Sequence, residues 1–526
     1  MANLSQQKRE RMLAFLNKIK EEHKDDDETL IALDEIENEL NSKKYGLVWE
    51  KHEEEVDRMM QDNIPVFTEV KKREIKATDE NSYNFLLEGD NLHSLKLLEK
   101  THTGKIDVIY IDPPYNTGKE FIYNDTLTIT ADSYKHSKWL SFMNSRLCVA
   151  KTLLSDKGII FISIDDNEFS QLKLLCDEIF GEENNIASFC VIRAEGGGMA
   201  KQVIKGHDYC LAYAKNISRF TPLAKQKDIR GKIIEKEGYK YWIQEDWLRK
   251  EFGKYGNCHY EEILKYKGKK VKEEIDAGLE KGYYTLIKKS NGMHIVGKLR
   301  SLKNDSSKFY SVLKHLNKNG VNELKQLGIK FDYPKPSSLI KELIGGATFF
   351  KQQQDATILD FFAGSGTTAQ AVLELNKEDG GNRKFILCTN NENNICEEVT
   401  YERIKRVIHG YADVEGIPAN LKYFKTDFIS KDADDMSEEL LAHIKEMVEL
   451  ENGITLDNKH YLIVLSDEQA DELTENWSNY EDVKAIYVSR NVLFTSEQDT
   501  LFSNTEIHII PDYYFEYELK EVGETW

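Results

Sequence analysis

Four residues at positions 112–115, Asp-Pro-Pro-Tyr, have the clearest chemical character in the chain. They directly follow the apolar, β-branched run Ile106–Ile111, which is typical of a buried parallel strand. Because ligands of an open parallel sheet bind beyond the carboxyl ends of its strands, we expect this turn to face a site. Two successive prolines remove two N–H donors, so Asp112 and the neighbouring carbonyls offer only acceptors. Such a surface suits the amino group of a heterocycle, and Tyr115 adds a ring for stacking. A merely structural proline turn is the alternative.

A second segment of this kind is the glycine-rich run Leu359–Thr368, in which Gly364 and Gly366 separate an apolar strand from an amphipathic helix. The glycines allow the backbone to approach a ligand closely, and the helix N-terminus offers free N–H donors. No lysine follows the glycines, so this is not a Walker A phosphate loop. Glu392, after the next strand, is the candidate for holding a ribose hydroxyl, a role usually filled at the end of the second strand. A plain turn and a solvated loop carboxylate are the alternatives.

Positioning both segments requires an α/β fold that brings them to the same edge of a sheet. Apolar strand-like runs alternate with helical patterns on both sides of a central region that loses this rhythm. This alternation predicts βαβ units and one mostly parallel sheet, built from residues 84–215 and 356–409, with a site shared by Asp112 and Gly364. The expected strands are 84–88, 106–111, 158–165, 186–192, 209–214, 357–362 and 384–389, and the expected helices are 91–99, 168–179, 366–375 and 397–407.

The composition is that of a globular chain. Of its 526 residues, 40% are apolar and 31% charged, and the length predicts about three domains. No apolar run is long enough to span a membrane, and no secretory signal is recognisable. The seven cysteines form no Cys-x-x-Cys pair, and no His/Cys cluster has the spacing of metal ligands. We therefore expect no metal, no disulfide framework and a reducing cytoplasm.

Charge is distributed unevenly along the chain, whose formal net charge is −20. Residues 191–340 carry 31 basic and 17 acidic side chains, whereas residues 431–526 carry 6 and 24. A basic segment inside an acidic protein favours a polyanion-binding module, with a solvated lysine-rich surface as the alternative. The acidic C-terminal region should repel nucleic acid and is expected to contact protein.

The two chemical segments together resemble the amino-group DNA methyltransferases that use S-adenosylmethionine. Here Asp-Pro-Pro-Tyr precedes the Phe-x-Gly-Ser-Gly turn, with the basic segment between them, which is similar to the permuted order of the β-class enzymes. Further short motifs look like the modification (Mod) subunit of Type III restriction–modification systems. These motifs are Glu-Gly-Asp-Asn-Leu at 88–92, Asp-Pro-Pro-Tyr-Asn-Thr-Gly at 112–118, His-Asp-Tyr at 207–209, Tyr-Pro-Lys-Pro at 333–336, and the segments 44–50 and 507–515.

The resemblance implies transfer of a methyl group to adenine N6 on a Rossmann-like methyltransferase sheet. The adenine amino group is a poor nucleophile, because its lone pair is delocalised into the ring. Asp112 and the Pro113 carbonyl would accept its two hydrogens, Pro114 would stiffen the turn, and Tyr115 would stack on the base. The base must leave the helix to reach this turn, so base flipping is implied. Phe121 and Tyr123 are expected to line the flipped-base pocket, although ordinary packing would also explain them.

The same resemblance assigns a set of residues to the cofactor. Asp90 could instead be only a helix N-cap, and Lys335 with Pro336 only a turn. His207 receives no catalytic role. The expected cofactor-binding residues are Asp90, Asn91, Lys335, Pro336, Asp360, Phe361, Ala363, Gly364, Ser365, Gly366, Thr367, Thr368 and Glu392.

The implied organisation has five parts. Residues 1–80 form a helical segment, 81–215 the catalytic half, 216–330 a target-recognition insert, 331–430 the cofactor-binding half, and 431–526 a small acidic α+β domain. Expected partners are double-stranded DNA, a second copy of the chain and a restriction (nuclease–helicase) subunit. Alternatives are a recognition subunit that mainly directs such a nuclease, and a methyltransferase acting on RNA or on protein glutamine. Four aromatic residues of the insert are expected either to contact DNA or to pack the core of the insert: Tyr239, Tyr241, Trp242 and Trp247.

Overall fold

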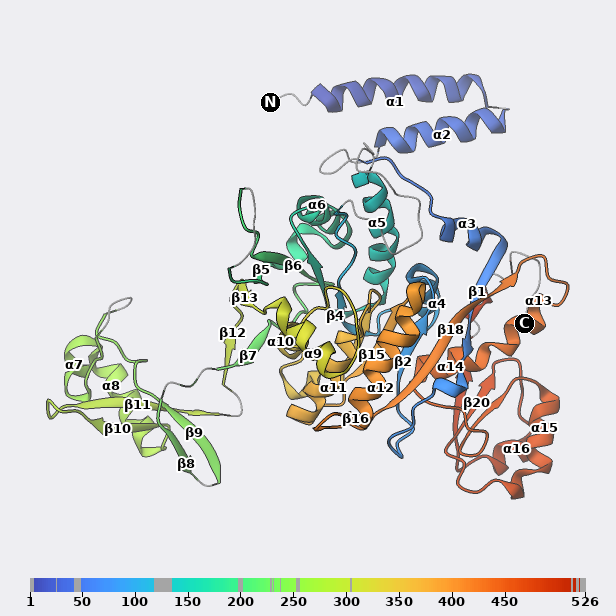
Figure 1. Ribbon diagram of the computed structural model, residues 1–526. Helices are drawn as coiled ribbons and strands as arrows, with labels where there is room; N and C mark the ends of the chain where they lie inside the picture. Colours follow the sequence, from blue (N-terminus) through green and yellow to red (C-terminus); the bar gives the residue numbers. More distant parts are fainter. Residues whose placement is uncertain are drawn as a thin grey trace.

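A ten-stranded, mostly parallel sheet organises the described part of the chain (Figure 1). The computed structural model describes residues 4–24, 26–41, 49–117, 135–196, 202–227, 229, 231–236, 238–251, 256–302, 305–511, 514–516 and 520. Phe121 and Tyr123, the expected base-pocket residues, lie outside these ranges. In spatial order the strands are β1 (Asn63–Glu69), β18 (Asn420–Ser430), β2 (Tyr83–Glu88), β15 (Lys384–Thr389), β14 (Thr357–Asp360), β3 (Ile106–Ile111), β4 (Leu154–Ile164), β6 (His207–Ala214), β5 (Asn185–Ile192) and β13 (Val312–Lys314).

The six strands from β18 to β4 all run parallel, and β6 is antiparallel to both β4 and β5. The expected α/β fold with a mostly parallel sheet is confirmed. The sheet is wider than the sequence indicated, because β1, β18 and β13 come from outside the two expected segments. β1 pairs antiparallel with β18 and closes one edge.

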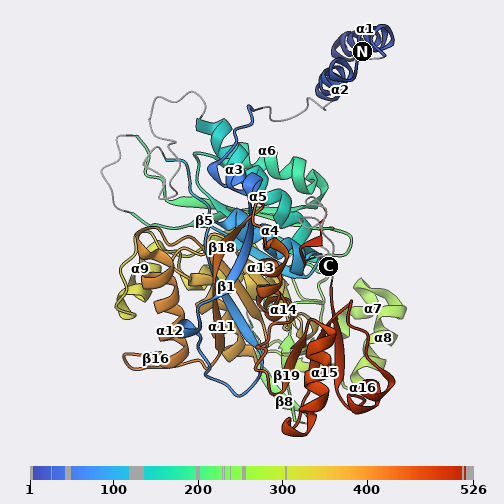
Figure 2. The same cartoon turned by 90° about the vertical axis from the view of Figure 1, so that its right-hand side faces the viewer.

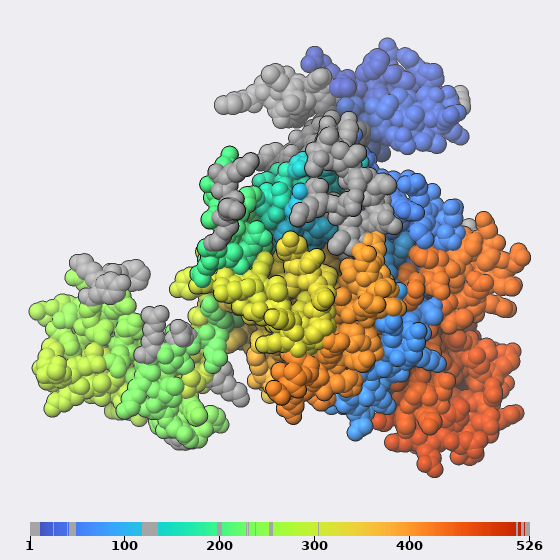
Figure 3. Space-filling model, viewed as in Figure 1, coloured from blue at the N-terminus to red at the C-terminus, as the bar shows by residue number. Residues whose placement is uncertain are grey.

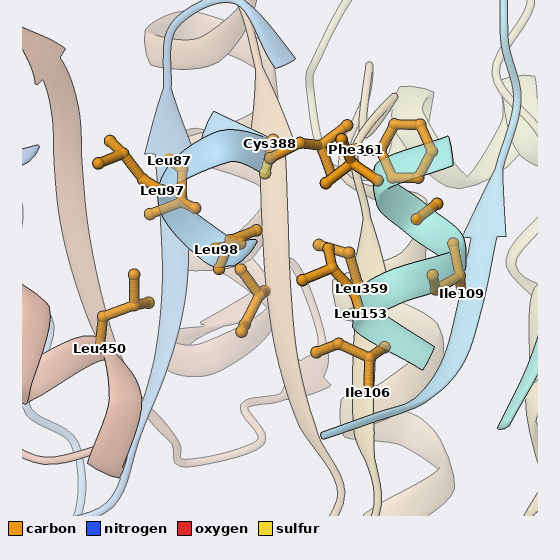
Figure 4. Packing of buried hydrophobic residues seen from close by; sticks show 14 of the residues in the cluster. Leu87, Leu97, Leu98, Ile106, Ile109, Leu153, Leu359, Phe361, Cys388 and Leu450 are labelled. Atoms are coloured by element: carbon orange, nitrogen blue, oxygen red, sulfur yellow. The ribbon is translucent and has the colours of Figure 1, made fainter. Parts of the chain in front are cut away.

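Helices cover both faces of the sheet, so its central strands are apolar throughout. One face carries α4 (Asn91–His102), α5 (Lys135–Leu153) and α6 (Phe169–Phe180), and the other α10 (Ser337–Ala347), α11 (Thr367–Asp379) and α12 (Tyr401–His409). Each fully buried aliphatic side chain contributes roughly 1.5–3 kcal/mol. Figure 4 shows the first face, with Leu97, Leu98, Ile109, Leu153 and Leu359 among the labelled side chains.

Part of the basic segment forms a lobe that stands beside the sheet domain (Figures 1 and 3). Its four-stranded sheet has the order β10 (Tyr284–Lys288), β11 (His294–Ser301), β9 (Tyr239–Gln244) and β8 (Ile233–Lys236), flanked by α7 (Ile263–Tyr266) and α8 (Gly268–Glu280). A two-stranded ribbon of β7 (Ala224–Gln226) and β12 (Ser306–Lys308) connects it to the body. We call residues 231–302 the insert lobe. It has 16 basic and 11 acidic residues, so most of the excess positive charge of 191–340 lies next to the lobe rather than in it.

Of the four aromatic residues expected either to contact DNA or to pack the core of the insert, two take part in packing the lobe. The Trp242 indole is buried and donates to Asp305 at 2.6 Å. The Trp247 indole donates to the Val296 carbonyl at 2.8 Å and stacks on Tyr284. The Tyr239 side chain, by contrast, is exposed.

The C-terminal region divides between the main core and a small sheet. The helices α13 (Met436–Ala442) and α14 (Ile444–Asn452) pack on the same core as α4 and α5. The parallel strands β19 (Tyr461–Val464), β20 (Ala485–Ser489) and β21 (Glu506–Ile510) follow, with α15 (Asp467–Glu475), α16 (Ser496–Leu501) and a separate apolar cluster.

The N-terminal helices form a hairpin away from the sheet (Figure 2). They are α1 (Leu4–Glu22) and α2 (Asp27–Asn41), and α3 (Glu55–Asp62) then leads into β1. Among the described residues, no helix is both long and apolar enough to cross a membrane.

α9 (Asn317–Gln326) precedes the Tyr-Pro-Lys-Pro segment and rests on the second face of the main sheet.

Candidate active site

A cavity of about 550 Å³ lies where β3, β4, β14 and β15 end. Its wall includes all four residues of the Asp-Pro-Pro-Tyr turn, and also Lys335 and Gly364. Asp112 and Gly364 therefore border one space, although they are far apart in the sequence. Parallel strands explain this proximity, because the turns that follow β3 and β14 leave the sheet at the same edge.

The Asp-Pro-Pro-Tyr turn is held by side chains from α5 and the start of α6. The Trp139 indole N–H donates to the Pro114 carbonyl at 2.8 Å. Asn116, which has a φ of 51°, donates to the buried Glu168 carboxylate, and His136 lies 2.6 Å from the same oxygen. Among the described residues, no donor reaches the Pro113 carbonyl. The turn therefore keeps one carbonyl acceptor available while its other end is fixed.

Lys335 lies across the acceptor side of this turn. Its ammonium is 3.0 Å from Asp112 Oδ1, donates to the Tyr115 hydroxyl, and lies 4.7 Å from the centre of the Tyr115 ring. The Tyr115 hydroxyl itself donates to Asp112 at 2.8 Å. Burial and the nearby Asp112 and Asp208 carboxylates hold the pKa of Tyr115 well above its usual value, so the phenol remains a donor.

Asp208, on β6, adds a second carboxylate to the same cavity. Its side chain is only 5% exposed, and it lies 3.2 Å from Arg193 and 4.0 Å from Lys335. Burial raises the pKa of Asp208, while Lys335 and Arg193 act in the opposite direction. Two carboxylates, Asp112 and Asp208, thus flank one lysine.

The glycine-rich turn has the backbone that its residue types predict. Gly364 and Gly366 have φ values of 47° and 73°, in the left-handed region that favours glycine. A Cβ on Gly366 would lie 3.2 Å from the Thr400 methyl group. The Thr400 hydroxyl donates to the Gly364 carbonyl, which fixes the turn against the segment before α12.

Asp360, at the end of β14, is buried beneath this turn. Its carboxylate accepts the Phe362 N–H at 3.0 Å and the Thr368 hydroxyl at 2.5 Å. Burial raises its pKa to about 7. A smaller cavity of about 180 Å³ borders Asp360, together with Ala363, Gly364, Ser365, Thr367 and Thr368.

A buried arginine joins the glycine-rich turn to the Lys335 segment. Arg403 on α12 donates to Thr367 at 2.6 Å and to Ser365 at 3.1 Å. It also donates to Glu323 at 3.2 Å, and Glu323 accepts the Ser337 N–H at the start of α10. Arg403 and Glu323 therefore link the glycine-rich turn to the segment that carries Lys335.

Several expected cofactor residues serve other contacts. Asp90 caps α4 by accepting the Leu92 N–H at 2.7 Å, and Asn91 donates to the Phe361 carbonyl at 2.9 Å. Arg146, fully buried on α5, donates to the Asn91 side chain. The residues of the expected set that border neither cavity are Asp90, Asn91, Pro336, Phe361, Gly366 and Glu392. Their role in cofactor binding stays a prediction.

Other cavity residues were absent from the expected set. Thr389 and Asn390 border the cavity where β15 ends, whereas Glu392 does not. Asp208 is the central residue of the His-Asp-Tyr motif at 207–209, which was a usable signal for this carboxylate. Asn116 and Tyr333 belong to the short motifs at 112–118 and 333–336, and Phe362 belongs to the glycine-rich run, so each had a usable signal. The lining residues without one are Asp165, Arg193, Asn317, Phe331 and Ile395.

The larger cavity has the size and the chemistry of a nucleoside-type cofactor site. Its volume lies within the roughly 300–1,000 Å³ typical of small-molecule pockets. It combines an apolar ring at Phe362, a glycine backbone at Gly364, and polar groups after β15 at Thr389 and Asn390. The acceptor-rich turn at Asp112 closes the other end. One space can therefore hold a cofactor beside a second ligand that offers N–H groups.

Comparison with known proteins agrees with this geometry. The model of the N6/N4 methyltransferase family, described as DNA methylase, matches residues 106–402. The chain is 36% identical over 385 residues to the Type III restriction–modification enzyme StyLTI Mod subunit of Salmonella typhimurium, covering 63% of this chain and 58% of that relative. It is 29% identical over 536 residues to the EcoPI Mod subunit of Escherichia phage P1, covering 84% of this chain and 78% of the relative.

A Type II enzyme and a solved structure are also similar. The Type II methyltransferase M.KpnI of Klebsiella pneumoniae is 36% identical over 344 residues, which are 58% of this chain and 79% of the relative. The structure of the PvuII DNA methyltransferase (cytosine-N4-specific) matches 73% of this chain and 98% of its own at 14% identity. Its TM-score of 0.35 is too low to say anything about the site.

Proposed function

Because the chain belongs to the DNA methylase family, we propose that it is a site-specific DNA methyltransferase that methylates adenine at N6. Its cofactor is S-adenosylmethionine, which supplies an electrophilic methyl group when bound. The observation that carries the proposal is the shared cavity, which the acceptor-rich turn at Asp112 and the glycine-rich turn both border.

The chain's own residues would activate the target nitrogen by removing its conjugation. The Asp112 carboxylate and the Pro113 carbonyl would each accept one N6 hydrogen, which favours a tetrahedral nitrogen whose lone pair points toward the donor methyl. On gaining the methyl group the nitrogen would become positively charged, and Asp112 would offset that charge. One N6 proton is then released, through Asp112 to solvent.

The target base would have to leave the duplex to reach this turn, so the proposal includes base flipping. Tyr115 offers a ring face for stacking, and burial keeps its hydroxyl protonated. We place DNA contact on the insert lobe and on the basic segments beside it, because phosphate neutralisation dominates such binding. Residues 216–330 are accordingly the proposed target-recognition region.

Similarity to Mod subunits supports a Type III assignment, in which one chain both recognises and methylates DNA. On this proposal a second copy of the chain and a nuclease–helicase subunit are partners. A recognition subunit that mainly directs that nuclease is the second candidate, favoured by the same relatives. An acceptor-only turn would be unnecessary in a pure recognition module.

Methylation-sensitive long-read sequencing of DNA from cells expressing the chain tests the proposal. We expect N6-methyladenine at one sequence motif, and none in cells expressing Asp112→Ala. Detection of N4-methylcytosine instead would show that the target base is cytosine. Unmodified DNA with a folded, cofactor-binding chain would refute the activity and leave the recognition role.

A further inference from the structure

Lys335 occupies the place where the proposed function puts the target amino group. Its ammonium is an N–H donor 3.0 Å from Asp112, and it lies over the Tyr115 ring on which the base would stack. The ammonium therefore stands in for the N6 group, both in its hydrogen bonding and in its position. Its side chain is only 10% exposed, so it fills this position from within the cavity wall.

A target base and the Lys335 ammonium cannot occupy the same acceptor and the same ring face. The ammonium must move when the base enters, and moving a buried cation away from its carboxylate is costly unless another anion receives it. Asp208 Oδ2 lies 4.0 Å from the Lys335 ammonium. Among the described residues, Asp112 and Asp208 are the two carboxylates within ion-pair distance of this ammonium. Taking a nearby anion as the new partner requires only a small shift.

Asp208 is well suited to receive a donor. It is almost fully buried, and no hydrogen bond from the described residues reaches its Oδ1 atom. Arg193 Nε is 3.2 Å from this oxygen, which holds the carboxylate in place, while Oδ2 faces Lys335. A buried carboxylate whose Oδ2 faces the ammonium gains from a charge-assisted hydrogen bond to it.

We propose that Asp208 is a positioning residue that takes the Lys335 ammonium from Asp112 when the flipped target base enters. This change of ion-pair partner frees both the Asp112 acceptor and the Tyr115 ring face for the base. It rests on the proposed base-flipping methylation and adds a residue that acts on the base through Lys335. Without a carboxylate at 208, Lys335 stays on Asp112 and competes with the base.

A double-mutant cycle between Asp208→Asn and Lys335→Met tests this coupling on a duplex carrying the motif found by sequencing. The first readout is the fluorescence of 2-aminopurine at the target position, which rises when the base leaves the stack and requires no methyl transfer. The second readout is the single-turnover methylation rate, and the third is duplex affinity by anisotropy.

We expect Asp208→Asn to lower target-base occupancy and single-turnover rate about tenfold while duplex affinity changes less than about twofold. In the Lys335→Met background the same substitution should change occupancy less than about twofold, because no ammonium needs a new partner. Asp107→Asn is the matched control: this carboxylate lies on β3, where it accepts the Thr357 N–H, and it borders neither of the two cavities.

Equal losses of occupancy in both backgrounds would overturn the proposal, because Asp208 would then act without Lys335. Unchanged occupancy in Asp208→Asn would overturn it as well. The target-base occupancies can be compared even if Lys335→Met cannot transfer methyl groups, because the 2-aminopurine fluorescence requires no methyl transfer. A wild-type chain that methylates no adenine is a separate failure, which concerns the proposed function and appears already in the sequencing experiment.

Discussion

Asp360→Asn should stabilise the protein at alkaline pH and lose that advantage as the pH falls. Burial raises the Asp360 pKa from an ordinary 3.8 to about 7, so the folded state binds its proton more tightly than the unfolded state does. The stability from this proton is complete below about pH 4 and is lost as the pH rises through about 7. A shift of about three units corresponds to about 4 kcal/mol at pH 8, at roughly 1.4 kcal/mol per unit.

The assay is the melting temperature of the wild type and Asp360→Asn across pH 5 to 8, followed by calorimetry. An asparagine cannot ionise, so the difference in melting temperature should grow with pH and level off above about pH 7. Asp355→Asn is the matched control, because it removes the same charge from an exposed carboxylate just before β14. A difference that is constant across this range, or largest at pH 5, would refute the assigned ionisation of Asp360.

Three further outcomes follow from the site and the lobe. Gly366→Leu should weaken S-adenosylmethionine binding in a calorimetric titration, because Gly366 has a φ of 73° and a Cβ there approaches Thr400; unchanged affinity would separate this turn from the cofactor. Arg403→Ala should cost about 3 kcal/mol in chemical denaturation, since it leaves the partly buried Glu323 without its cation, and a loss below about 1 kcal/mol would contradict that role. DNA affinity should fall steeply with salt, and replacing 231–302 by a short linker should reduce that slope; an unaltered slope would place the phosphate contacts elsewhere.

Residue types alone predicted the central strands of the sheet and the chemical character of the two turns. Strands β3 and β15 coincide with the expected runs 106–111 and 384–389, because buried parallel strands are apolar on both faces and end at polar turns. The glycines at 364 and 366 adopt the backbone for which glycine is suited. Adjacent prolines after Asp112 likewise remove donors in any conformation. These are local properties, which is why residue types were enough.

Which distant side chains meet in the cavity depends on how the chain folds. β1 and β18 join the sheet through long-range pairing, and neither was among the expected strands. Asp208 reaches the site because β6 lies antiparallel beside β4, and Lys335 reaches it because its segment lies against the glycine-rich turn. Spacing along the chain does not predict such contacts, because they depend on strand order and on how helices cover the sheet. The pairing of Lys335 with both Asp112 and Asp208 is therefore a property of the folded chain that the sequence alone does not predict.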